Sequence, residues 1–261
     1  MKLSCCLWGL NERPGATESD NLELLAQLGF EAIDICPSMQ KSTQSKTKLK
    51  ELELQVGCIS ISHEAPPGST FDTDDEKQRY PLIRHTTEAV NHASEMGADY
   101  TYVVPGPFIN DRTYTHYAEQ YAQLAEHAQV QGVKLGIEHF PGTAFPSVLS
   151  TLDFIKDVDH PNLYLLFDIG HAQISKEDPA EVLPLAADRL LYVHLDDNDG
   201  EYDLHLALTN GLQTRESLTE LFSVLKDIAY DGFVSLEMHP QLPDPFAAIR
   251  QSKELIDPLL Y

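Results

Sequence analysis

The sequence predicts an α/β protein of the (β/α)8 TIM-barrel class, with one domain over residues 1–261. Short apolar or β-branched runs alternate with longer amphipathic stretches along the whole chain. Parallel strands need such crossover helices, and eight βα pairs in about 260 residues fit a closed barrel. The alternative, an open doubly wound sheet, favours a glycine-rich loop after the first strand, and GLNERPG is not of the form GxGxxG.

Eight segments have the length and composition of buried strands. In chain order they are LSCCLW (3–8), FEAIDI (30–35), QVGCISIS (55–62), YTYVV (100–104), VKLGIE (133–138), LYLLFD (163–168), LLYVHLD (190–196) and FVSLE (233–237). The first is interpreted as a strand rather than a secretion signal, because its apolar run is short and NERPG follows at once. Helical patterns lie between the strands, and several close on a glycine, as helix C-termini often do. These helical segments are residues 18–29, 76–97, 117–132, 177–187, 215–229 and 245–260.

Composition narrows the classes of partner. The chain has 41 acidic and 18 basic residues, a formal charge of -23, which repels polyanions and argues against nucleic acid. Apolar runs stay well short of the roughly 18 residues needed to cross a bilayer, which argues against a membrane protein. Four cysteines without disulfide or metal-knuckle spacing are typical of reduced residues in the cytoplasm. Self-association into a homo-oligomer stays open.

Metal-binding side chains stand where the predicted strands end. These positions hold His63, Glu138, Asp168, His171, His194, Asp196 and Glu237. In a barrel all strand ends meet on one rim, so the side chains would share one pocket. Asp168 alone could equally cap the next helix, but glutamate is a poor N-cap and gathered carboxylates repel one another without a counter-ion. The four strand ends that carry Glu138, Asp168, His194 and Glu237 therefore predict a divalent cation, and oxygen ligands with one imidazole suit manganese, magnesium, cobalt or zinc.

Two further pairs follow from spacing. His194 and Asp196 are two residues apart on a strand and point to the same side, so Asp196 could orient a ligand. Asp203 and His205, in the loop GEYDLHLALTNG, are also two apart, and they either contribute to the site or are simply solvated.

Four stretches of the chain resemble a known superfamily. They are GIEHF (136–140), FDIGH (167–171), VHLDDNDGEYDLH (193–205) and SLEMHP (235–240). Their order along strands five to eight resembles the xylose-isomerase-like TIM-barrel superfamily, which contains sugar isomerases and ketose 3-epimerases, inosose dehydratases and the endonuclease IV group. The likeness covers nearly the whole chain.

The resemblance to the epimerase and isomerase branch implies a metal-dependent enzyme. By motif, Glu138, Asp168, His194 and Glu237 would hold one divalent ion, and His171 would contact the substrate. Glu138 and Glu237 would flank a small keto sugar or polyol and move a proton at the carbon beside the carbonyl, through an enediolate. The arginine that this branch tends to carry beyond the strand-seven histidine has no counterpart in DDNDGEY.

The endonuclease branch, with its trinuclear zinc cluster, shares other positions. His63, His171, Asp203 and His205 each match a ligand of that pattern, whereas Val104 stands where it has a histidine. That substitution and the -23 charge argue against cleavage of DNA. The four matching residues are therefore expected to bind substrate hydroxyls or a second, weaker ion.

Aromatic residues near the rim could add to substrate binding. Trp8, at the predicted end of strand one, could stack on a sugar ring together with Phe108 and Phe140, although plain packing is the commoner role for such residues.

Three functions are consistent with these residues. The first is a divalent-metal-dependent isomerase or epimerase of a small keto sugar or polyol. The second is a dehydratase or lyase that uses the same cation but expels a hydroxyl, as in inosose dehydratases. The third is a barrel without catalytic activity, or an endonuclease IV-like phosphodiesterase. Bound metal and product analysis distinguish them.

Overall fold

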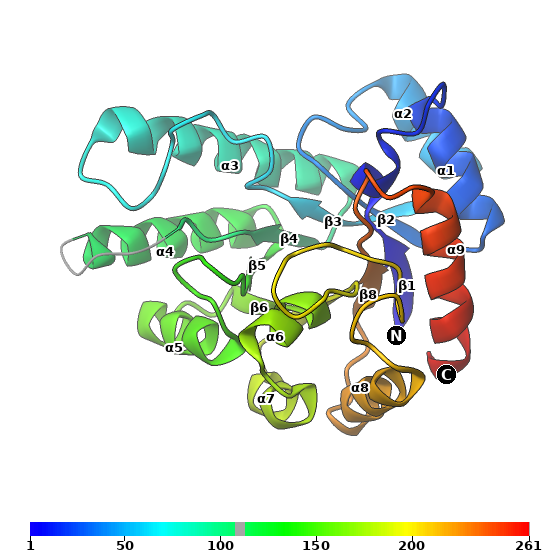
Figure 1. Ribbon diagram of the computed structural model, residues 1–261. Helices are drawn as coiled ribbons and strands as arrows, with labels where there is room; N and C mark the ends of the chain where they lie inside the picture. The colour runs from blue at the N-terminus through cyan, green and yellow to red at the C-terminus, as the bar shows by residue number, and fades with distance from the viewer. Residues whose placement is uncertain (108–112, 261) are drawn as a thin grey trace.

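A computed structural model describes residues 1–107 and 113–260, and it shows eight parallel strands in a nearly closed barrel with helices around it (Figure 1). The strands are β1 (Lys2–Cys5), β2 (Ala32–Ile35), β3 (Gln55–Ser60), β4 (Tyr100–Val103), β5 (Lys134–Glu138), β6 (Leu163–Asp168), β7 (Leu190–Leu195) and β8 (Phe233–Leu236). Their order in the sheet is β1-β8-β7-β6-β5-β4-β3-β2. The predicted fold class and all eight strands are confirmed.

The barrel closes where β1 and β2, the first and last strands in this order, meet. β1 pairs with β8 along its whole length, from Lys2 opposite Phe233 to Cys5 opposite Leu236. Between β1 and β2 there is one isolated bridge, in which Cys6 lies opposite Asp34. The seam between the first two strands is therefore the most weakly hydrogen-bonded joint of the barrel.

The first strand is shorter than the sequence predicts. β1 ends at Cys5, and Leu7–Leu10 forms a 3-10 helix, η1, so Trp8 lies in a helical turn and not on a strand. Leu7 and Leu10 are both buried, which is the three-residue spacing of a 3-10 turn. A short apolar run does not distinguish such a turn from a strand, and this explains the wrong boundary.

The helices cover the outside of the barrel, and the long α3 and α4 pack side by side (Figure 1). They are α1 (Glu18–Gln27), α2 (Thr43–Glu51), α3 (Glu76–Met96), α4 (Tyr114–Val130), α5 (Val148–Val158), α6 (Ile169–Ser175), α7 (Pro179–Ala186), α8 (Arg215–Asp227) and α9 (Pro245–Ile256), followed by the 3-10 helix η2 (Asp257–Leu259). The sequence prediction names six of them and omits α2, α5 and α6. Every helix within the described residues is too short or too polar to span a membrane.

Two apolar clusters hold these layers together. The larger one lies between the sheet and the helices. The smaller one, with residues from six strands, fills the barrel interior and consists of Ala32, Cys58, Tyr102, Leu166, Leu191, Tyr192 and Phe233. Beyond this cluster, toward the carboxyl ends of the strands, the barrel interior holds buried polar side chains, among them Glu138, Asp168, His194 and Glu237. The site is built there.

The start of α5 is held by a side chain from a distant loop. The carboxylate of Glu177 accepts hydrogen bonds from the backbone N–H groups of Val148 and Leu149, at 2.8 and 3.4 Å. Because these N–H groups have no partner within the helix and carry its positive dipole, we expect Glu177→Ala to lower the free energy of unfolding by about 1 kcal/mol. Glu177→Gln keeps an acceptor and should lose less. Urea unfolding of both variants measures these losses, and a free energy of unfolding of Glu177→Ala equal to that of the wild type would contradict this role of Glu177.

Candidate metal centre

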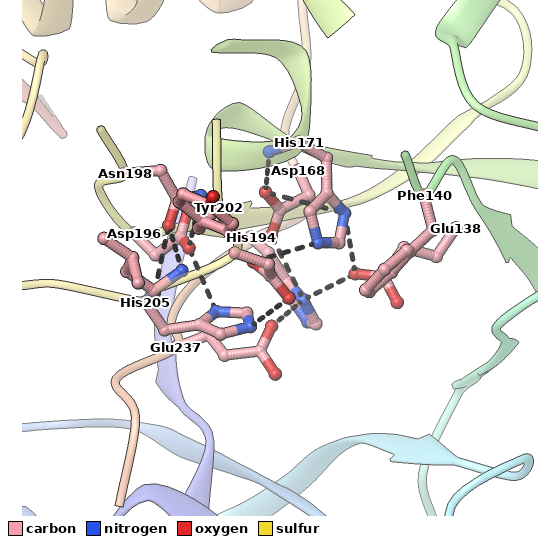
Figure 2. Close-up of polar contacts among 12 residues, drawn as sticks. Glu138, Phe140, Asp168, His171, His194, Asp196, Asn198, Tyr202, His205 and Glu237 are labelled. Atoms are coloured by element: carbon pink, nitrogen blue, oxygen red, sulfur yellow. Dashed lines mark hydrogen bonds and ion pairs between the residues drawn. The ribbon is translucent and has the colours of Figure 1, made fainter. Parts of the chain in front are cut away.

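Four predicted ligands meet at the carboxyl end of the barrel (Figure 2). Glu138 ends β5, Asp168 ends β6, His194 is the fifth residue of β7, and Glu237 directly follows β8. One ligand atom from each lies within 4.8 Å of all the others, and all four residues are buried. The structure thus brings together residues that are up to 99 positions apart in the chain (237 minus 138).

The ring of His194 lies at the centre of this group. Its Nδ1 is 2.7 Å from Glu237 Oε2, 3.4 Å from Glu138 Oε1 and 3.9 Å from Asp168 Oδ2. Burial by itself lowers the pKa of His194, but the charges of Glu237 and Glu138 outweigh it and raise that pKa well above its usual range. The nitrogen that faces the carboxylates is therefore the focus of a strong negative field.

Asp168 serves both as a helix cap and as a member of this group. Its Oδ1 accepts the backbone N–H of His171 at 2.7 Å and so caps α6. Its Oδ2 is buried without a hydrogen-bond partner and points to the other ligand atoms. The two interpretations that the sequence left open are compatible, because each applies to a different oxygen.

The donor set fits a divalent cation. Asp168 Oδ2, Glu237 Oε2 and His194 Nδ1 are all buried and lack a hydrogen bond of acceptable geometry. Three buried carboxylates around one imidazole carry more negative charge than the ring can balance, and buried charges without partners are costly. Carboxylate oxygens with one imidazole nitrogen are ligands that Mn²⁺, Mg²⁺, Co²⁺ or Zn²⁺ accept.

A second group of possible ligands lies beside the first. His171 Nε2 is 3.5 Å from Asp203 Oδ1, and Asp203 Oδ2 is 3.0 Å from His205 Nε2. The Nδ1 of His171 donates to the carbonyl oxygen of His139 at 2.9 Å, and its Nε2 faces the carboxylate of Asp203. Burial lowers the pKa of His171, but Asp168 and Asp203 raise it to about 10.

The loop after β7 presents this second group. Asp196 Oδ2 lies 3.0 Å from His205 Nδ1, and Asn198 Oδ1 accepts the backbone N–H groups of Leu204 and His205. Burial and the charge of Asp168 raise the pKa of Asp196 to about 7. Asp196 does point inward beside His194, as the period of the strand predicts, and it positions His205.

Trp8 and His63 lie against each other at the edge of the first group. The indole N–H of Trp8 donates to Glu237 Oε1 at 3.1 Å, and its ring meets that of His63 edge-on at 5.3 Å between centroids. Among the described residues, His63 belongs to neither group of ligand atoms. Its Nδ1 is buried without a hydrogen-bond partner.

The remaining rim residues are placed more simply. The ring of Phe140 packs on that of His171, with centroids 4.2 Å apart. Phe108 lies outside the described residues. Val104 packs against the apolar cluster in the barrel interior, so strand four offers an apolar side chain at the position where an endonuclease-like centre would need a histidine.

Sequence reasoning missed residues that support the ligands from behind. His139 is buried, and burial lowers its pKa well below the usual range. Its Nε2 accepts the backbone N–H of Asp168 at 3.1 Å and so fixes the end of β6. Asp34, at the end of β2, is fully buried and lies 3.8 Å from His194 Nε2. A carboxylate at a strand end is the signal that identified the other residues, and it applies equally to FEAIDI.

Curated relatives of the chain include sugar-processing enzymes. An uncharacterized protein of Methanocaldococcus jannaschii, MJ1311, is 28% identical over 236 residues, which cover 84% of this chain and 78% of that protein. Fructoselysine 3-epimerase of Shigella flexneri is 25% identical over 259 residues and 90% of each chain. An inosose dehydratase of Geobacillus kaustophilus is 30% identical over 156 residues, but this match spans only 53% of the chain and 50% of that enzyme.

Solved structures with this fold include sugar epimerases. The crystal structure of a D-tagatose 3-epimerase-like protein superposes with a TM-score of 0.78 at 24% identity, over 99% of this chain and 98% of the other. The structure of L-ribulose 3-epimerase gives a TM-score of 0.84 at 18% identity, over 100% and 95%. At these identities the likeness shows the fold.

The family comparison covers nearly the whole barrel. The xylose isomerase-like TIM barrel family matches residues 22–259, a span that includes both groups of ligand atoms and seven of the eight strands. With the parallel barrel and the strand-end ligands in place, this match identifies the chain as a member of the xylose isomerase-like TIM barrel family.

Proposed function

We propose that this protein is a divalent-metal-dependent isomerase or epimerase of a small keto sugar or polyol. One observation carries the proposal: buried ligand atoms of Glu138, Asp168, His194 and Glu237 converge at the carboxyl end of the barrel, and those of Asp168, His194 and Glu237 lack a hydrogen-bond partner. Relatives that are named as sugar epimerases support it. A bound cation would polarise the carbonyl of the substrate and stabilise the negative charge that develops on its oxygen.

The two glutamates are placed to transfer a proton. Glu138 and Glu237 come from β5 and β8, with two strands between them in the sheet, and they approach His194 from different sides (Figure 2). One carboxylate would take the proton from the carbon beside the carbonyl, and the other would return a proton to the opposite face. The hydrogen bond from Trp8 holds Oε1 of Glu237 and leaves Oε2 toward the centre.

The second group would bind the substrate. His171 and His205 offer N–H donors and Asp203 offers carboxylate oxygens for sugar hydroxyls, and the rings of His63, Trp8 and Phe140 lie nearby. The same group could hold a second, weaker ion. Lysine and arginine do not occur in the loops that carry His63, Phe140, Asp203 and His205, which are residues 61–70, 139–147 and 196–214, so an uncharged sugar fits better than a sugar phosphate.

A dehydratase is the second candidate, because inosose dehydratases are among the relatives. It would use the same proton abstraction but would lose a hydroxyl as water. Incubation with a panel of ketohexoses and inososes in D₂O distinguishes the two by NMR. Deuterium beside the carbonyl of an epimer or isomer supports the first function, and an unsaturated or dehydrated ketone supports the second. Absence of both across the panel, with metal bound, would contradict the proposed chemistry.

Removal of the ion should lower thermal stability. An ion that binds only the folded state stabilises it by mass action, by about 2.7 kcal/mol at a hundredfold excess over the Kd. For a chain of this size that corresponds to roughly 5–10 °C in Tm. Differential scanning calorimetry with and without a chelator measures the shift, and Glu138→Ala is the paired variant because it should melt at one temperature in both buffers. Identical wild-type melts would contradict a tightly held ion.

A further inference from the structure

A fully buried carboxylate lies inside the barrel beneath the proposed metal centre. Asp34 is the second-to-last residue of β2, and its side chain points into the barrel interior. TIM barrels normally fill this interior with branched apolar side chains. Among the described residues, the hydrogen-bond and ion-pair partners of Asp34 include Ser4, Cys6, Tyr192, His194 and Ser235 but no lysine or arginine. A buried charge of this kind is costly, so its presence needs a specific reason.

The hydrogen bonds of Asp34 account for one of its two oxygens. Oδ1 accepts from the hydroxyls of Ser4 and Tyr192, at 2.7 and 2.6 Å. Oδ2 lies 3.7 Å from the weak thiol donor of Cys6 and faces His194 Nε2 at 3.8 Å, and the hydroxyl of Ser235 also interacts with this carboxylate. Ser4 and Tyr192 therefore fix the carboxylate so that its less occupied oxygen is directed at the imidazole.

The ring of His194 consequently lies between three carboxylates on one side and the carboxylate of Asp34 on the other. Nδ1 faces Glu138, Asp168 and Glu237, whereas Nε2 faces Asp34 and has no hydrogen-bond partner. The separation of 3.8 Å is that of an ion pair and not of a hydrogen bond. In a site that excludes water, attraction over this distance still strongly favours an N–H, and not a lone pair, on the nitrogen that faces the carboxylate.

We propose that Asp34 is a positioning residue for His194, which keeps the proton on Nε2 and thereby leaves the lone pair of Nδ1 free for a divalent cation. When the cation binds, the Nδ1 proton leaves to solvent and the Nε2 proton stays opposite Asp34. Carboxylates behind ligating histidines act in this way in metal sites generally. This inference rests on the proposed metal centre, since it assigns a role to Asp34 only if His194 is a ligand.

The isosteric variant Asp34→Asn tests this role. The amide oxygen can still accept from Ser4 and Tyr192, which directs the NH₂ group at His194 Nε2. An N–H there favours a lone pair on Nε2 and a proton on Nδ1, the nitrogen that a cation needs. The matched control is Tyr192→Phe, which removes one hydrogen bond to the same carboxylate but keeps its charge.

The first readout is the affinity for Co²⁺ alone, titrated into metal-free protein and followed by visible absorption. We expect Asp34→Asn to weaken binding by about 10- to 100-fold, and Tyr192→Phe to weaken it by much less. The melting temperature of metal-free Asp34→Asn should fall, because one partner of a buried ion pair has been removed, so circular dichroism before each titration checks that the variant is folded. Equal cobalt affinity of Asp34→Asn and the wild type would overturn the role of Asp34 and leave the metal centre intact.

A second readout needs no substitution. Long-range ¹H–¹⁵N NMR of the zinc-loaded wild type, with labelled histidine, reports which nitrogen of His194 carries the proton. A protonated Nε2 supports the proposal, and an unprotonated Nε2 overturns it. A wild-type protein that binds neither cobalt nor zinc would instead overturn the proposed function itself, together with this inference.

Discussion

Glu237→Gln should lower kcat by about a thousandfold or more while the protein stays folded. Glutamine has the shape of glutamate and can still accept the indole N–H of Trp8, so the side chain should keep its place. It loses the charge that faces His194 Nδ1 at 2.7 Å and the ability to take up a proton. Turnover of the best sugar from the panel, together with circular dichroism of the variant, measures both parts of this expectation.

Glu64→Gln is the matched control for that variant. Glu64 also lies near a strand end on the rim, but its carboxylate accepts from the backbone N–H and hydroxyl of Ser38 and so is engaged in a loop contact. Its substitution should leave kcat close to that of the wild type. Retention of most of the activity in Glu237→Gln would remove Glu237 from the proposed mechanism.

Gly170→Ala should destabilise the fold by about 3 kcal/mol, because overpacking a closely packed interior forces neighbours to move. A Cβ on Gly170 would overlap Asp196 Oδ1 and Asn198 Nδ2, both fully buried side chains. Either α6 moves away from the loop after β7, or Asp196 leaves His205. Thermal melts of the metal-free protein should show a drop of roughly 6–12 °C.

The control is Gly106→Ala, where the nearest atom to a new Cβ is Thr70 Oγ1 at an ordinary 3.7 Å. Its melting temperature should differ little from that of the wild type. If Gly170→Ala also melted at the wild-type temperature, α6 would be free to shift at little cost, and the close approach at Gly170 would have no structural consequence.

The sequence predicted the fold because its signals are repeated eight times. Each strand is an apolar run bounded by polar residues, and one wrong boundary, as at Trp8, does not alter the alternation of strands and helices. Helix α2 was not named because TQSKTKLKE has only one buried residue, Leu49, and hence almost no amphipathic pattern. Helix α6 was missed because it starts directly after β6, where the sequence shows a single apolar run.

The candidate ligands were predictable because parallel strands bring their ends to one rim whatever the separation in sequence. Asp34 also lies at a strand end, but a single aspartate at that position is equally consistent with a helix N-cap. Only the structure shows that its carboxylate faces His194. The role of His139 depends on which backbone N–H its ring meets, and the sequence carries no signal for that contact. The identity of the sugar depends on loop shape, which periodicity does not encode.

The pairing of β1 with β8 also governs when the protein can become functional. Lys2 leaves the ribosome long before Phe233, the residue that it pairs with in the sheet. Until that later segment emerges, β1 can contact β2 but has no β8 to pair with, and Trp8 lacks its partner Glu237. Pairings between remote parts of a chain form slowly and leave apolar edges exposed meanwhile. A nascent chain would therefore acquire its last ligand at the moment when the barrel closes.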